Sequence, residues 1–262
     1  MDRPNRGRVW QFADCCVTVT LAVLAQFREG GRMHTPRHFR TDDPAREARL
    51  IRENPFGLIV SAGAGGAGSD DGPAGGIAPV ATHVPMLRRP GPGGPPADDE
   101  PLPGTMIIGH LARINPQWKA LRPGQPVLAV FLGPDGYVSP TVYGSSPSVP
   151  TWNYAAVHVT GTVRLVDDRD EAWAIIQASV DATEAYAGTD WDRTPSVQYI
   201  GKLLAAIVAF EITVTEVRST FKLSQNKPAE TQRRVHASFA RSRHGRDREL
   251  AALMADMLDL SA

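Results

Sequence analysis

Three short segments combine amide, aromatic and basic side chains in a way that suits a flat, polar-edged ring with an anionic tail. They are residues 115–118 (NPQW), 151–158 (TWNYAAVH) and 222–226 (KLSQN). Amides can hydrogen-bond the heteroatoms of a ring, and aromatic side chains can cover its face. A lysine or arginine can meet a phosphate. Because each segment lies at the edge of an expected β-strand, the three segments form the candidate binding site.

The elements expected around these segments are mostly strands, with two helices inserted late in the chain. Alternating and β-branched runs predict strands at residues 56–61, 77–87, 105–112, 126–132, 137–139, 154–166 and 207–217. Residues 133–136 (GPDG) predict a turn. Helices are expected at residues 45–53, 169–186 and 196–206, and from residue 229 onward. This order predicts an α+β protein, mainly β, built as a closed or split antiparallel barrel with peripheral helices.

Several common catalytic and nucleotide-binding patterns are missing from the sequence. No G-x-G-x-x-G stands between a strand and a helix, and neither a P-loop nor a G-x-S-x-G turn occurs. His83, His110 and His158 fall on different segments without a carboxylate or cysteine at ligand spacing, so no metal site is predicted. Hydrolases and metalloenzymes are therefore disfavoured.

The charge balance argues against a strong electrostatic footprint for nucleic acid. The chain has 262 residues, 28 basic and 28 acidic, with an isoelectric point near 7.1. The two cysteines, Cys15 and Cys16, are adjacent and do not suggest a structural disulfide, which favours a cytoplasmic protein. One basic tract could contact DNA or form a solvated helical face: Arg233, Arg234, Arg241, Arg243, Arg246 and Arg248.

The chain divides into three expected parts. Residues 1–32 are predicted to be an extension outside the fold, with Met33 as the functional start, because Asp14 interrupts an apolar run that is too short for an ordinary membrane span. A short export or anchoring segment is the alternative, but no membrane association is expected. Residues 33–228 are the expected binding domain, and residues 229–262 the expected helical tail.

Further motifs occur together with the three segments in a fixed order. They are residues 33–39 (MHTPRHF), 54–57 (NPFG), 81–85 (ATHVP) and 109–113 (GHLAR). Over about Met33 to Pro228 this order resembles the PaiB-type family, whose members are described as FMN-binding negative transcriptional regulators. The family is similar to the pyridoxamine-phosphate-oxidase-like split barrels, which implies a homodimer with FMN in the groove between subunits. The first 32 residues, the long Gly/Pro loops and the basic stretch after Pro228 depart from the pattern.

The resemblance implies a set of FMN-binding residues. Some would hold the phosphate where two neighbouring strands end, others would close over the ribityl chain or ring, and others would face the pyrimidine edge or N1/O2. Each also has an ordinary structural alternative, as a hydrogen-bonded core residue, a dimer-interface residue or a polar turn. The set is Thr82, His83, His110, Arg113, Asn115, Gln117, Trp118, Trp152, Asn153, Tyr154, Lys222, Gln225 and Asn226.

Three classes of function follow from the resemblance and stay open on the sequence alone. The first is a PaiB-like negative transcriptional regulator that binds FMN. The second is a flavin-dependent oxidoreductase, because related split barrels move electrons through FMN. The third is a haem-handling protein on the same fold, which the histidines permit. Direct DNA binding has no recognisable motif to support it.

Overall fold

The computed structural model describes residues 35–41, 43–63 and 78–260, and residues Thr35–Ala262 form one compact unit. The predictions for residues 1–32 and for most of the glycine-rich segment 63–76 lie outside the described residues. The strands are β1 (Phe56–Ala62), β2 (Pro79–Arg88), β3 (Met106–Ala112), β4 (Gln125–Val138), β5 (Thr151–Val166) and β6 (Ile207–Lys222). The α-helices are α2 (Pro44–Glu53), α3 (Pro140–Tyr143), α4 (Arg169–Ala187), α5 (Val197–Leu203), α6 (Ala229–Ala240) and α7 (Gly245–Leu258). Short 3-10 helices are η1 (Arg37–Phe39), η2 (Pro116–Lys119), η3 (Thr194–Ser196) and η4 (Leu204–Ala206).

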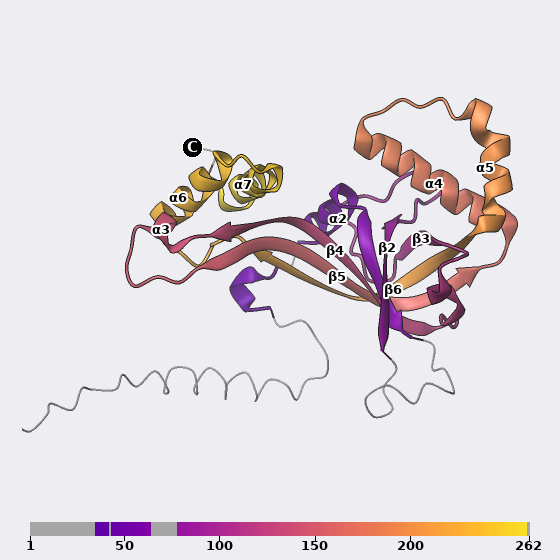
Figure 1. Cartoon of the computed structure of the whole chain (residues 1–262), viewed down its shortest axis with the longest axis horizontal. Helices are drawn as coiled ribbons and strands as arrows, with labels where there is room; N and C mark the ends of the chain where they lie inside the picture. The colour runs from indigo at the N-terminus through magenta and orange to yellow at the C-terminus, as the bar shows by residue number, and fades with distance from the viewer. Residues whose placement is uncertain (1–34, 42, 64–77, 261–262) are drawn as a thin grey trace, which may run out of the picture. The chain divides into compact units, whose positions relative to one another are not determined.

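The six strands form a closed antiparallel barrel in the order β1-β2-β3-β6-β5-β4, with β4 pairing back onto β1 (Figure 1). The helices lie around this barrel, and α4 and α5 occupy the connection between β5 and β6. The prediction of a mainly β, α+β barrel with peripheral helices is confirmed.

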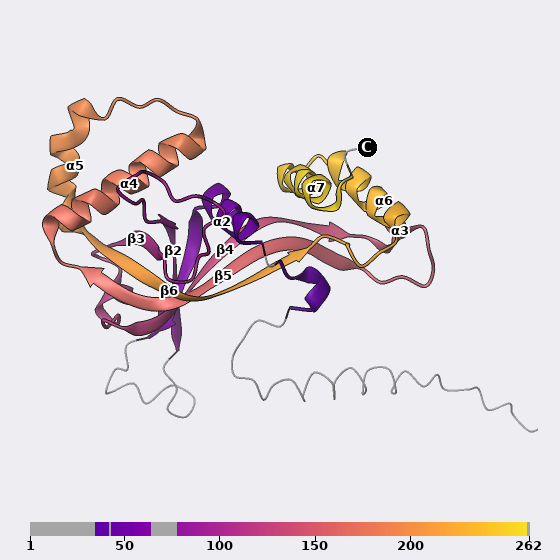
Figure 2. The same ribbon diagram turned by 180° about the vertical axis from the view of Figure 1, so that it is seen from behind.

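Strands β4, β5 and β6 are longer than the barrel requires and continue past it as a three-stranded arm. The pairing of β1 with β4 ends at Leu58 and Val130, whereas the pairing of β4 with β5 continues to Val138 and Thr151. Figures 1 and 2 show α6 and α7 on one side of this arm. Phe239, on α6, and Leu250, on α7, lie close to Gly136 of β4.

The turn predicted at residues 133–136 is wrong. Strand β4 continues through this segment with a shift of register between Leu132 and Asp135, and the chain reverses only after Val138. The glycines serve close packing instead: a Cβ on Gly136 would stand 2.6 Å from Phe239, and one on Gly133 would stand 3.2 Å from Leu50. A glycine-rich segment therefore indicated contact with helices rather than a reversal of the chain.

The main core fills the barrel and continues along one face of the arm. Residues alternate along the strands, so that Ile59, Met86, Phe131 and Phe210 point inward and are fully buried. The helices α2, α6 and α7 add Leu50, Ile51, Val235, Phe239, Leu250 and Met254 to the same cluster. We call the opposite side of the sheet the outer face.

Helix α4 covers part of the outer face through a second, smaller apolar cluster. Ile175 packs there against Ile108, Val166 and Ala209 of the sheet. Asp168 caps the start of the helix, accepting a hydrogen bond from the Glu171 N–H at 2.8 Å. The helix is thus fixed to the strands through its N-terminal half.

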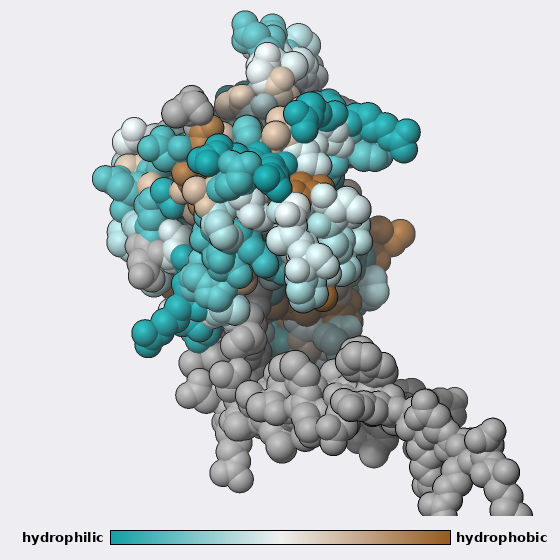
Figure 3. Space-filling view, turned by 90° about the vertical axis from the view of Figure 1, so that its left-hand side faces the viewer, coloured by the Kyte–Doolittle hydropathy of each residue, from teal (hydrophilic) through white to brown (hydrophobic). Residues whose placement is uncertain are grey.

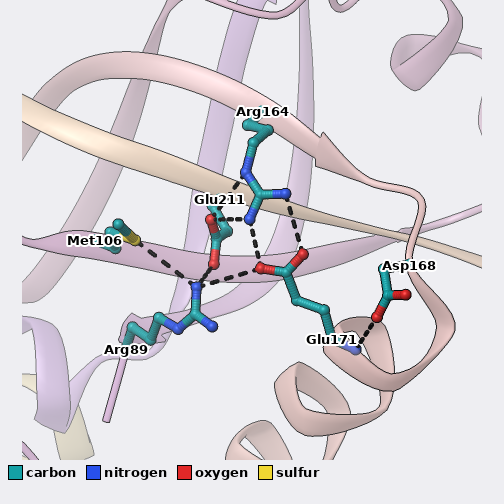
Figure 4. Close-up of polar contacts among 6 residues, drawn as sticks. All are labelled: Arg89, Met106, Arg164, Asp168, Glu171 and Glu211. Carbon is teal, nitrogen blue, oxygen red and sulfur yellow. Dashed lines mark hydrogen bonds and ion pairs between the residues drawn. The ribbon is translucent and has the colours of Figure 1, made fainter. Parts of the chain in front are cut away.

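A network of charges next to this cluster ties α4 to three strands (Figure 4). Glu211, on β6, is only 3% exposed and accepts hydrogen bonds from Arg89 and Arg164. Arg164 also binds both carboxylate oxygens of Glu171, and these hydrogen bonds lower the pKa of the Glu171 carboxyl. A buried carboxylate needs such partners, because an unpaired charge in the interior is strongly destabilising.

We expect Glu211→Gln to lower the free energy of unfolding by about 2 kcal/mol, because it removes the charge that holds two arginines. The matched control is Glu216→Gln on the same strand, which breaks a half-exposed pair with Arg218 and should cost less than about 1 kcal/mol. Urea titrations of the three proteins measure both changes. Equal losses in the two variants would contradict a stabilising role for the network.

Candidate functional site

The first group of predicted residues lies near the start of β2 and the end of β1, beside the 3-10 helix η2. Asn115 caps η2 by accepting the Gln117 N–H at 2.9 Å, and its Nδ2 donates to Thr82 Oγ1 at 2.9 Å. Gln117 is 2% exposed, and its Nε2 donates to Ser61 Oγ at 3.1 Å and to the carbonyl of Val80 at 3.1 Å. We call Thr82, Asn115 and Gln117 the amide cluster.

One hydrogen-bond acceptor of the amide cluster has no donor among the described residues. The Oε1 atom of Gln117 is buried and has no hydrogen-bond partner among the described residues. A buried amide oxygen without a donor costs stability, which makes it a place where a ligand or water hydrogen bond would be favourable.

Arg113 and Trp118 lie together beside the amide cluster. The indole Nε1 of Trp118 donates to the Arg113 carbonyl at 2.8 Å, and the guanidinium of Arg113 stands 5.5 Å from the centre of the indole ring. Arg113 also donates to the carbonyls of Ala205 and Ile207, both at 2.8 Å. Its first task is therefore to hold the end of η4 against β3, and its side chain remains exposed.

The second group lies on the arm, around the start of β5 and the end of β6. Asn153 is fully buried, and its Nδ2 donates to Ser224 Oγ at 2.9 Å. Ser224 has a φ of 68°, in the left-handed region that costs a non-glycine residue energy. Asn153 therefore fixes the turn after β6 and is covered by Met254 of α7.

Lys222 is the partly buried cation of this second group. It pairs in register with Tyr154, donates to Thr151 Oγ1 and stands 5.8 Å from the ring of Phe39. Burial, reinforced by the nearby charge of Lys227, lowers the pKa of the Lys222 ammonium. An anion at this position would offset both effects.

The turn that follows Lys222 is held by the side chain of Gln225. This side chain accepts the Leu223 N–H at 2.7 Å and donates to the Phe221 carbonyl. Asn226 is exposed at the tip of the turn. Gln225 thus has a structural task, whereas the Asn226 amide is open to solvent.

Several predicted residues share the outer face of the sheet. Cross-strand partners lie on one face, and one row of partners joins His83, Leu58, Val130, His158 and Arg218. Burial lowers the pKa of His158 in this row. Further along the outer face the predicted residues Trp152, Tyr154 and Lys222 follow at alternate positions, with Tyr137 in edge contact with Trp152 at 5.9 Å.

Apolar side chains surround these residues on the outer face. Phe56 is 66% exposed and stacks on the ring of His83 at 5.8 Å, and Leu132 is 52% exposed. Tyr137 and Trp152 are exposed to a similar degree. The outer face thus combines apolar area with a few cationic and polar groups.

His110 lies apart from both groups. Its side chain is half-buried on β3, lines a cavity under α4 and α5, and has an Nδ1 atom without a partner among the described residues. Burial lowers the pKa of its imidazole.

The structure therefore divides the predicted residues among three places. Among the described residues, no hydrogen bond or ion pair joins the amide cluster to the residues on the arm. Sequence reasoning had not singled out Ser61, Thr151 and Ser224. Thr151 and Ser224 lie inside the predicted segments, but only their contacts show which neighbours they serve.

Comparison with known proteins shows the family of the chain. A family model described as "Putative FMN-binding domain" matches residues 33–216, most of the chain. The chain belongs to this FMN-binding family. The Bacillus subtilis protein named protease synthase and sporulation protein PAI 2 is 29% identical over 228 residues, which cover 86% of this chain and 98% of that protein. The predicted resemblance to the PaiB type is confirmed.

Two further comparisons cover less of this chain. An uncharacterized Saccharomyces cerevisiae protein is 32% identical to this member of the FMN-binding family over 155 residues, covering 55% of this chain and 84% of that one. The structure of an FAD and heme binding protein from Mycobacterium smegmatis is 17% identical with a TM-score of 0.47, covering 74% and 78% of the two chains.

The residues present fit the flavin expected of this FMN-binding family. The partly buried Lys222 and the exposed His83 can meet anionic groups, while the exposed Asn226 offers an amide group to a polar ring edge. Among the residues that the structure describes, no group of three His, Cys, Asp or Glu side chains could hold a metal ion. No helix within these residues is long and apolar enough to cross a membrane.

We expect His110→Gln to weaken the pH dependence of stability on the acidic side. Because the folded state binds the His110 proton less readily than the unfolded chain, its contribution is present above about pH 6.5 and is lost as pH falls through the folded pKa. Urea titrations at about pH 7.5 and about pH 5 should show a smaller loss in the variant. His158 contributes alike in both proteins, so identical losses would contradict the effect of burial on His110.

Proposed function

We propose that this protein binds FMN in a groove between the outer faces of two copies of the chain and acts as a PaiB-like negative regulator of transcription. The observation that carries the proposal is the outer face itself, where predicted residues stand among exposed apolar side chains. Family membership supports a flavin, and the supply of cationic and amide groups supports FMN with its single phosphate.

Lys222 is the residue whose surroundings most favour the anionic part of FMN. Its ammonium is partly removed from water, has a hydroxyl partner in Thr151 and has no ion-pair partner among the described residues. A phosphate, or the negative charge of a reduced ring near N1/O2, would restore a charge partner at this point. Trp152 and Tyr137 supply aromatic surface beside it.

The full-length protein should bind FMN with a micromolar or lower Kd, which corresponds to about −8 kcal/mol or better. Lys222→Met should raise the Kd about tenfold, because a charge-assisted hydrogen bond is lost. Titration of FMN fluorescence measures both values. Lys202→Met on α5, where the lysine is exposed, is the matched control and should leave the Kd unchanged. Absence of quenching in the parent protein would overturn FMN binding itself.

A second copy of the chain would complete the proposed site. Two facing protomers can enclose a ligand between exposed residues of their outer faces, such as His83 of one protomer and Trp152 of the other. The exposed Phe56, Leu132 and Trp152 provide apolar area for such an interface. Burying a few such side chains is the usual driving force of homodimer formation.

Leu132→Glu should therefore convert the dimer to monomers and weaken FMN binding together with it, because the substitution places a charge in the apolar interface. Tyr199→Glu is the control, since Tyr199 is 65% exposed on α5, away from the outer face of the arm. Light scattering after size-exclusion chromatography gives the masses. A Leu132→Glu dimer with parental FMN affinity would show that the interface lies elsewhere.

A flavin-dependent oxidoreductase is the second candidate, and one observation on the basic tract favours it. Arg233 and Arg234 both pair with Glu230 at 3.1 Å, and Arg246 pairs with Asp135 at 3.1 Å. Figure 3 shows the hydrophilic side chains on the end of the arm where these helices lie. Arginines already paired with carboxylates have less charge to offer to phosphates of DNA.

The two candidates are distinguished by measuring both outputs on the flavin-loaded protein. A regulator should show no sustained oxidation of NADH or NADPH, and any DNA binding should weaken steeply with salt. Steady nicotinamide-driven turnover without DNA binding at low salt would replace the regulator with the oxidoreductase.

A further inference from the structure

A cavity of about 290 Å³ lies between helices α4 and α5 and the outer side of β2 and β3. Figure 1 shows α4 and α5 together at the end of the sheet that contains β2 and β3. The walls are mainly aliphatic and include Pro85, Ile176, Val180, Ile200 and Leu204. The cavity belongs to one protomer and contains His110 as its nitrogen-bearing side chain.

The cavity lies beyond the point where α4 is attached to the sheet most firmly. The charged network and Ile175 hold its N-terminal half on the sheet. Ile176, Val180 and Thr183, further along the helix, face the cavity. An apolar cavity of about 150 Å³ can hold benzene, so a volume near twice that suits a fused two-ring molecule.

The two hydroxyl groups in the wall already donate their hydrogens to backbone carbonyls. Ser179 Oγ donates to the Ile175 carbonyl at 2.8 Å, and Thr183 Oγ1 donates to the Ser179 carbonyl at 2.7 Å. They leave only lone pairs toward the cavity. His110 is then the one ring in the wall that can donate a hydrogen bond to a ligand.

The two nitrogens of His110 differ in their surroundings. Among the described residues, the buried Nδ1 has no hydrogen-bond partner, and Nε2 has none either. Buried N–H groups without an acceptor are rarer than buried acceptors without a donor. The neutral imidazole is therefore expected to carry its hydrogen on Nε2, the nitrogen that is less enclosed.

We propose that this cavity binds a small, flat, mainly apolar molecule that carries one hydrogen-bond acceptor, with the Nε2–H of His110 as the donor. The acceptor is a ring nitrogen or a carbonyl oxygen. Aliphatic walls bind the flat surface, and the single donor selects molecules with an acceptor at one edge. This site does not depend on the proposed FMN site.

Quinoline and naphthalene test the proposal as a matched pair, because they share a shape and only quinoline has an acceptor. Isothermal titration calorimetry of the full-length protein should give a Kd for quinoline about five- to tenfold lower than for naphthalene. His110→Leu should remove this difference and keep the binding of naphthalene. Equal affinity of the parent protein for both, or binding of neither, overturns the proposal.

Filling the cavity provides the second test. Val180→Phe should abolish the binding of both probes, whereas Ala174→Phe, an exposed position on the same helix, should leave binding unchanged. Unchanged quinoline binding in Val180→Phe overturns the location of the site. Saturating FMN should not displace quinoline from the parent protein, and displacement would overturn the independence of the two sites. The His110→Leu comparison decides the matter if Val180→Phe does not fold.

Discussion

The pairing of β5 with β6 is the constraint on which the rest of the molecule depends. It runs from Tyr154 and Lys222 on the arm to Val166 and Ala209 in the barrel, with one shift of register at Gly161. A Cβ at Gly161 would stand 2.4 Å from the Thr213 carbonyl, so the strands could not approach in this way around a larger residue. Since side chains alternate along a strand, this one register decides which residues enter the core and which face outward.

The division into two faces gives each helix its place. On the inner face α2, α6 and α7 extend the barrel core along the arm, and α7 covers Asn153. On the outer face α4 is held by a buried carboxylate, and the cavity beside His110 remains where that attachment ends. On the arm, Thr35 and Phe39 cover the outer face beside Thr220 and Lys222, whereas Trp152 stays exposed. The core, the cavity and the candidate groove all result from the alternation of side chains between the two faces of the sheet.

Much of this could be predicted from sequence because the signals are local. Alternation predicted the strands, the helix expected at residues 45–53 is found as α2, and dense polar segments predicted the candidate site. The burial of Asn153 could not be predicted, because the shift of register in β4 and the position of α7 decide it. The hydrogen bond between Arg89 and Glu211 could not be predicted either, because the two residues are distant in the sequence. The site residues were identified by type, but their distribution over three places required the fold.

Strand β6 also determines when the barrel can close. It pairs with β3 on one side and with β5 on the other. Met106 of β3 therefore has no partner on β6 until Thr213 has been made. A growing chain that has not yet produced β6 carries two unpaired strand edges on apolar strands, which are the surfaces that aggregate most readily. Closure between such distant segments is also slow. Until this last strand of the sheet is made and paired, a newly made chain therefore has to be kept from aggregating with other chains.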